Sequence, residues 1–154
     1  ELLAVFPEAP LLERTSMNSW DDRKVRDALK RNGRNKVVVS GLWTEVCVTW
    51  PTVEMLGAGY RVYVVDDCCG ATSAAAHEAA LSRMVQAGAT RLTTIAALLE
   101  WQRDWRDHTH YDALMGILKQ HAGAYGSGIE YAYTMVHKAP QSAQVPHRVV
   151  KPTK

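Results

Sequence analysis

The chain has 154 residues, of which 47% are hydrophobic and 22% charged, so it is long enough for one globular domain with a real core. Its net charge of +2 is too small to predict a nucleic-acid partner or an anionic membrane surface. The sequence holds no run near the ~20 apolar residues of a membrane span, so it predicts no membrane partner.

The first elements are a loop and a short helix. Residues 1–20 are irregular, because prolines interrupt them and no hydrophobic period persists. Arg14 lies in this loop, where an arginine is usually a solvated surface group. A helix is predicted over residues 21–32, which have a narrow apolar face and basic residues elsewhere, and Gly33 supplies its stop signal.

The next stretch places a cysteine just after a strand. Residues 37–40 predict a strand, and a helix follows to about residue 56, with Thr44 as its expected N-cap and Pro51 as an expected kink. Cys47 falls in the first turn of that helix. Free N–H groups and the partial positive charge there favour thiolate over thiol, which makes Cys47 a candidate nucleophile. The alternative is that Cys47 is a small core residue.

The remaining elements repeat the same order. An apolar strand is predicted at 61–66 with a loop at 66–70, a helix from Thr72 or Ser73 to about 87, a third strand at 91–95, and helices at 96–106 and 111–121. Three strand–helix units predict parallel strands with right-handed crossovers, an α/β doubly wound sheet with helices on both faces. Residues 1–122 are therefore assigned to one domain. The glycine- and proline-broken residues 123–154 are expected to form an extended arm at an oligomer interface.

Other reactive residues do not form a recognisable site. The adjacent Cys68 and Cys69 lack metal or redox spacing, and with three cysteines in total they predict no disulfide framework but a reducing compartment, the cytoplasm. His77 is expected to be a packed or hydrogen-bonded histidine, and His108 and His110 point apart on any regular element. These spacings predict no metal site. Glycine-rich phosphate loops and a serine-esterase elbow are also absent, and no cofactor is predicted.

Several motifs carry a family resemblance. The stretch GLWTEVCV at residues 41–48 is followed in order by DDCCGA, by His77, by RMVQAGA and by EWQRDW. In this order and spacing the chain resembles the isochorismatase-like cysteine hydrolases over about residues 1–120, and most closely their YcaC-like branch. The resemblance implies the doubly wound parallel sheet that the strand–helix order also predicts.

The resemblance also implies catalytic roles. Cys47 matches the family nucleophile, and Arg14 matches the basic residue of the family triad. The third member, an aspartate at the end of the family's first strand, has no counterpart in this chain. The sequence is therefore expected to be the C-terminal portion of the domain, with a preceding segment that supplies the aspartate and strands pairing with residues 37–40. Without those strands, residues 37–40 are expected to be an exposed sheet edge.

The family further places a cis peptide bond just before the nucleophile turn, at Leu42–Trp43 in this sequence. The N–H groups of Trp43 and Cys47 would then converge as an oxyanion hole. The Trp43 side chain is expected to bind substrate at the mouth of the cleft.

Together these features predict a cytoplasmic, metal-independent cysteine hydrolase of a small-molecule amide, ester or related C–N or C–O bond. The resemblance implies a homo-oligomer, an octamer in the branch it matches. Two alternatives stay open: a non-catalytic oligomeric module of the same fold, and an amidase of the nicotinamidase type.

Overall fold

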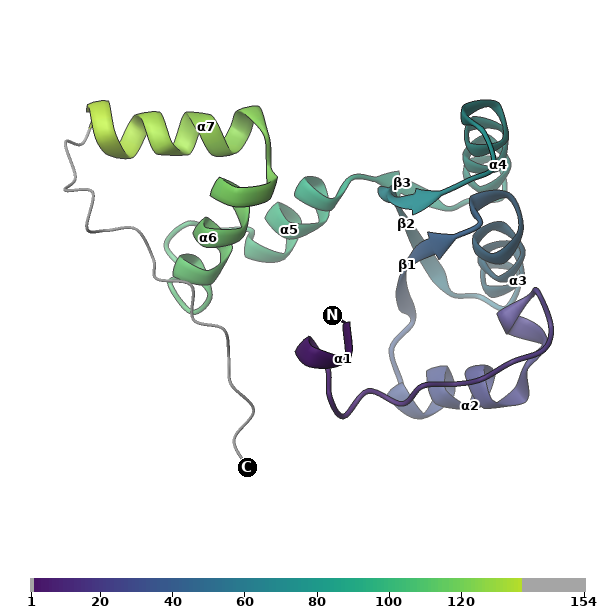
Figure 1. Cartoon of the computed structure of the whole chain (residues 1–154). Helices are drawn as coiled ribbons and strands as arrows, with labels where there is room; N and C mark the ends of the chain where they lie inside the picture. Colours follow the sequence, from purple (N-terminus) through teal and green to yellow (C-terminus); the bar gives the residue numbers. More distant parts are fainter. Residues whose placement is uncertain (1, 137–154) are drawn as a thin grey trace. The chain divides into compact units, whose positions relative to one another are not determined.

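The computed structural model describes residues 2–136 and divides the chain into two compact units, one ending at Thr94 and the other beginning at Ile95 (Figure 1). The elements of the first unit are α1 (Leu2–Val5), η1 (Ser19–Asp21), α2 (Arg23–Asn32), β1 (Lys36–Leu42), η2 (Thr44–Val48), α3 (Thr49–Gly57), β2 (Arg61–Gly70), α4 (Ala74–Gln86) and β3 (Thr90–Leu92). Those that follow are α5 (Thr94–Gln102), α6 (Tyr111–His121), α7 (Ala124–Tyr131) and η3 (Ala132–Val136). None of the helices in the described part is long and apolar enough to cross a membrane.

A parallel three-stranded sheet forms the centre of the first unit, in the order β1-β2-β3. The predicted parallel α/β arrangement is thereby confirmed. A consecutive strand order with right-handed crossovers puts both connecting helices on one face. Accordingly α3 and α4 contact each other and lie on the same side of the sheet (Figure 1). The sequence predicts helices on both faces of the sheet, and α3 and α4 form the helical layer on one of them.

Strand β2 lies in the middle of the sheet and carries the core. Val62 and Val64 are almost fully buried and pack against Leu81 and Met84 of α4. The near-continuous apolar character of this strand is what a central parallel strand needs, because neighbours cover it on every side. Residues 66–70, predicted to be a loop, are instead the end of β2, where they pair with the end of β1 after a register shift.

Strand β1 is an edge strand in the described part of the chain, since it pairs with β2 alone. Its side chains alternate in burial: Val37 and Val39 pack on the core, whereas Val38 is 46% exposed. Within the described residues, 37–40 therefore lie on an edge strand with one free side, as expected. An apolar run such as that of residues 37–39 is typical of a strand with a neighbouring strand on each side. In the described residues β1 has only one neighbouring strand, β2.

Local signals fix two helices where the sequence predicts them. The Asp22 side chain caps α2 by accepting from the N–H of Lys24 at 2.8 Å, and Gly33 ends the helix with φ of 70°. Ser73 caps α4 by accepting from the N–H of Ala76 at 3.1 Å. Each cap supplies an acceptor for an N–H that has no partner inside the helix.

The third predicted strand is shorter than expected. The strand β3 ends at Leu92, and Thr94 already begins α5. The reason is a cap from a distant residue, because one carboxylate oxygen of Asp67 accepts from both the N–H and the hydroxyl of Thr94, at 2.8 and 2.9 Å. The helix predicted over 96–106 is also shorter, since α5 ends at Gln102 and Arg103 has a positive φ of 58°.

The second unit corrects the prediction of an extended tail. Residues 124–131 form helix α7, which packs on α6, whose bounds agree with the predicted 111–121. Gly126 allows this contact, since a Cβ there would lie 2.9 Å from the Lys119 carbonyl oxygen and closer still to that of Leu118. Lys119 also pairs with Glu130 of α7 at 3.2 Å. Residues 137–154 of the predicted arm lie outside the described residues.

Candidate active site

The predicted nucleophile turn follows β1 directly. The Leu42–Trp43 peptide bond is cis, as predicted. The turn itself, η2, is a π-helical segment that begins at Thr44 and has Trp43 at its N-cap position. The predicted cap is therefore one residue too late. Thr44 does not cap the turn, because its side chain points into the protein and is completely buried.

Cys47 lies in this turn as a half-buried free thiol. The Trp43 carbonyl accepts hydrogen bonds from the N–H groups of Val46 and Val48, at 3.1 and 3.2 Å, on either side of Cys47 in the sequence. The sequence predicts a kink at Pro51 inside one continuous helix. In the structure the helix is divided before that point, because η2 ends at Val48 and α3 begins at Thr49. Pro51 thus falls in the first turn of α3, where its missing N–H costs little.

Apolar side chains near the turn are open to solvent. Leu42 is 65% exposed and Trp43 47% exposed, and Trp50 on α3 is 40% exposed. The substrate-binding role predicted for Trp43 requires an accessible side chain, and this exposure meets that requirement. The role itself stays a prediction.

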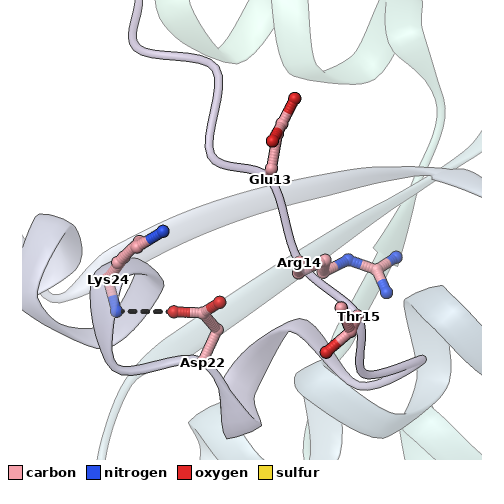
Figure 2. A pocket seen from close by; sticks show the side chains of 5 residues that line it. All are labelled: Glu13, Arg14, Thr15, Asp22 and Lys24. Atoms are coloured by element: carbon pink, nitrogen blue, oxygen red, sulfur yellow. Dashed lines mark hydrogen bonds between the residues drawn. The ribbon is translucent and has the colours of Figure 1, made fainter.

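Arg14 lies in the irregular segment that precedes η1. Its exposed side chain donates a hydrogen bond to the Ser16 carbonyl, within its own loop. Figure 2 shows Arg14 beside a shallow polar groove whose other lining residues are Glu13, Thr15, Asp22 and Lys24. This groove adjoins the start of α2, and none of its lining residues belongs to η2. The predicted partnership between Arg14 and Cys47 stays a prediction.

Thr44 is bonded to a chain of hydrogen-bonded side chains, His77 and then Asp66. The sequence did not predict that these residues are connected. The oxygen of the Thr44 hydroxyl lies 3.0 Å from Nδ1 of His77, and Nε2 of His77 lies 2.7 Å from a carboxylate oxygen of Asp66. A carboxylate only accepts, so Nε2 carries a proton. In the neutral imidazole Nδ1 is then the acceptor, and the Thr44 hydroxyl donates to it. His77 is the hydrogen-bonded histidine that the sequence predicts.

The chain continues to two more charged residues. Arg91 donates from Nε to the second oxygen of Asp66 at 2.7 Å and from its other two nitrogens to both oxygens of Glu78, each at 3.0 Å. Burial acts to raise the pKa of Asp66, but the hydrogen bonds from His77 and Arg91 outweigh it and hold that pKa below its usual range. Asp66 is therefore an ionised acceptor at neutral pH.

A second contact joins the turn to the loop before α4. One carboxylate oxygen of Glu45 accepts from the N–H of Thr72 at 3.0 Å and from its hydroxyl at 2.6 Å. These hydrogen bonds, led by that of the Thr72 hydroxyl, lower the pKa of Glu45. No local pattern in the sequence predicts this contact, because it joins residues 27 positions apart. It forms because Glu45 follows β1 and Thr72 follows β2, and the carboxyl ends of these parallel strands are neighbours.

Metal ligands do not gather in the described part. Among residues 2–136, no three His, Cys, Asp or Glu side chains are grouped closely enough to hold a metal ion. The turn η2 can supply the Cys47 thiol and backbone N–H donors, and hydrogen bonds of Thr44 and Glu45 hold it in place.

Comparison with known proteins gives a consistent family. The model of the isochorismatase domain matches residues 1–96. The probable hydrolase YcaC of Escherichia coli is 35% identical over 108 residues, which cover 70% of this chain and 52% of that protein. The chain thus spans about half the length of this curated relative.

Solved structures agree in fold. YcaC from Pseudomonas aeruginosa, solved with hexane-2,5-diol and covalent acrylamide, is similar with a TM-score of 0.76 and 34% identity, over 84% of this chain and 63% of that one. The Escherichia coli YcaC structure, an octameric hydrolase of unknown specificity, has a TM-score of 0.78 and 31% identity over 88% and 65%. The nicotinamidase of Staphylococcus aureus, 22% identical with a TM-score of 0.54 over 58% and 60%, shares the fold alone.

Proposed function

This chain belongs to the isochorismatase family, and from that premise we propose that it supplies the nucleophile, Cys47, of a hydrolase acting on a small amide, ester or related C–N or C–O bond. The observation that carries the proposal is the position of the Cys47 thiol. It is half-buried in a helical turn that directly follows the carboxyl end of a parallel strand. In open parallel sheets, ligands bind at that end of the strands.

The proposed chemistry is acyl transfer through a thioester. The Sγ atom of Cys47 attacks the substrate carbonyl carbon, the C–S bond forms, and the carbonyl oxygen becomes an oxyanion. Collapse of this intermediate breaks the C–N or C–O bond and expels an amine or alcohol. Water then hydrolyses the thioester, which releases the acid and restores the thiol.

Backbone N–H groups of Trp43 and Cys47 are proposed to hold the oxyanion. The hydrogen bonds of the Trp43 carbonyl support this assignment, because within the described residues they involve Val46 and Val48 and not Cys47. Arg14 is proposed as the cation of the site, and its exposed position leaves it accessible to an anionic group. The base that takes the thiol proton is assigned by the resemblance to an aspartate without a counterpart in residues 1–154.

Site-resolved alkylation by acrylamide tests the nucleophile. Acrylamide reacts with thiolates, and the covalent acrylamide in the YcaC structure from Pseudomonas aeruginosa makes it a relevant probe. We expect Cys47 to react first when the protein is digested after timed exposure and analysed by mass spectrometry. Cys69 is expected to react slowly, since burial raises its pKa. If the exposed Cys68 reacts faster than Cys47, the thiol of Cys47 is not activated and the non-catalytic module becomes the better reading.

We further propose that the protein is a cytoplasmic homo-oligomer without a cofactor, an octamer by likeness to the YcaC structure from Escherichia coli. Exposed apolar side chains in both units support an assembly, among them Val38 on the edge strand and Tyr131 and Met135 in the second unit. Static light scattering at micromolar concentration is expected to give a mass several times that of one 17.1 kDa chain. A monomer mass would contradict this part of the proposal.

An amidase of the nicotinamidase type is the alternative within the same chemistry. Its substrate would be the amide of an aromatic ring acid, which releases ammonia, and the broader proposal also includes esters, which release alcohols. Ammonia release from nicotinamide, measured beside release of alcohols from simple esters, separates the two.

A further inference from the structure

We propose that His77 and Asp66 are positioning residues for the Cys47 turn, acting through the buried hydroxyl of Thr44. The inference rests on the proposed function for its meaning in catalysis, but its test reads the reactivity of a thiol and needs no substrate. Nothing in the proposed chemistry gives these two residues a role.

Thr44 is the point at which the turn is fixed. It is the first residue of η2, it lies three residues before Cys47, and it is 0% exposed. Its hydroxyl donates to Nδ1 of His77, and its carbonyl accepts from the hydroxyl of Thr49 at 2.6 Å. The hydroxyl of Thr44 is thus hydrogen-bonded to α4, and its carbonyl is hydrogen-bonded to α3.

The acceptor of the Thr44 hydroxyl is itself held in a single orientation. Asp66 at the end of β2 fixes the His77 ring through Nε2, and Arg91 of β3 fixes Asp66. Arg91 is in turn held by Glu78, one residue after His77 on α4. One hydrogen bond, from Thr44 to His77, therefore links the turn to α4. Behind it, His77 is held to the other two strands by hydrogen bonds to charged groups, which are stronger than neutral ones.

The arrangement of Thr44, His77 and Asp66 has the order of a hydroxyl–imidazole–carboxylate triad, but burial gives it a different use. A nucleophilic hydroxyl must reach substrate, and the Thr44 side chain has no exposed surface. The three residues therefore act on the backbone of the turn. The Glu45–Thr72 contact adds a second brace one residue further along.

Replacing Thr44 by valine tests the brace, because valine keeps the shape and removes the hydroxyl. In the full chain, timed exposure to iodoacetamide followed by peptide mass spectrometry gives separate rates for Cys47, Cys68 and Cys69. We expect Thr44→Val to slow Cys47 about fivefold relative to Cys68, the size expected for one ordinary hydrogen bond. Thr44→Ser, which restores the hydroxyl, is expected to stay within about twofold of the wild type.

Two further variants separate positioning from stability. Thr52 is also completely buried, and its hydroxyl has no hydrogen-bond partner in the described residues, so Thr52→Val is the matched control and is expected to leave the Cys47 rate unchanged. His77→Gln keeps an N–H donor toward Asp66 but removes the ring nitrogen that lies 3.0 Å from the Thr44 hydroxyl. It is expected to slow Cys47 as Thr44→Val does, and the double variant is expected to be no slower than either single one.

The alkylation rates of Cys47 and Cys69 in these variants show whether the inference holds. An unchanged Cys47 rate in both Thr44→Val and His77→Gln would overturn the inference. A rise in the Cys69 rate together with that of Cys47 would overturn it as well, because the half-buried Cys69 reports loosening of the whole unit. Failure of the proposed function is seen separately, as hydrolysis that survives in Cys47→Ala.

Discussion

Replacing Cys47 by alanine is expected to abolish hydrolysis, with a fall in turnover of at least about a thousandfold, because the proposed acyl intermediate forms on the Cys47 sulfur. The measurement is release of 4-nitrophenol from a small 4-nitrophenyl ester, or of ammonia from a small amide. Alanine fits in the half-buried site without a new polar group, so the fold is expected to persist. Full activity in Cys47→Ala would contradict the mechanism.

The other two cysteines provide controls of matched chemistry. Cys68 is exposed, with its sulfur 3.0 Å from the hydroxyl of Thr94. Cys69 is half-buried and its thiol donates to the Val65 carbonyl at 3.2 Å. Neither contact touches η2. Cys68→Ala and Cys69→Ala are therefore expected to keep at least part of the activity, and equal loss in all three variants would point to unfolding instead of chemistry.

Replacing Asp66 by asparagine is expected to lower the free energy of unfolding by about 2 kcal/mol at pH 7, the size of hydrogen bonds to a charged group. The carboxylate of Asp66 is only 21% exposed and accepts from both His77 and Arg91. Asparagine keeps the shape but loses the charge and one acceptor. Urea unfolding of the two proteins measures the difference.

The same pair of proteins gives a pH dependence with a definite sign. The pKa of Asp66 is lower in the folded protein than its usual value of about 3.9. Such a group contributes stability that is fully present above the unfolded pKa and is lost as the pH falls through the folded pKa. The difference between wild type and Asp66→Asn is therefore expected to be present at pH 7, on the order of the figure above, and to shrink as the pH falls below about 4.

An exposed aspartate supplies the control for this prediction. Asp104 pairs with Arg106 at 2.8 Å, but the two side chains are 49% and 91% exposed. Surface pairs of this kind contribute roughly 0–1 kcal/mol. Asp104→Asn is expected to change stability little at any pH. An equal loss in both variants, or a difference that persists in acid, would contradict the role assigned to Asp66.

The sheet was predictable because its signals are local. Apolar runs mark β1 and β2. Ser73 marks the start of α4, and Gly33, a residue that readily adopts the positive φ found there, marks the end of α2. Each of these signals lies within a few residues of the element that it marks. The parallel order follows from the alternation of strands and helices. The site residues Cys47, Arg14 and Trp43 came from motif likeness, and of that prediction the cis bond before Trp43 is confirmed.

What the sequence could not supply depends on contacts between distant residues. The link from Thr44 to His77 joins positions 33 residues apart, and the link from Arg91 to Asp66 joins positions 25 apart. No local period encodes such pairs. The helix α7 was missed for a related reason, because its glycines read as breakers. Gly126 favours the helix only through its close approach to α6.

Identification of the acyl-enzyme distinguishes Cys47 catalysis from hydrolysis by any other group. The protein is mixed with 4-nitrophenyl acetate, quenched in acid during the first turnovers and digested, and the acetylated peptide is located by mass spectrometry. We expect an acetyl group on the sulfur of Cys47, formed together with a burst of nitrophenol and absent from Cys47→Ala. Hydrolysis that proceeds with Cys47 unmodified, or acetyl groups that accumulate equally on the exposed Cys68, would contradict it.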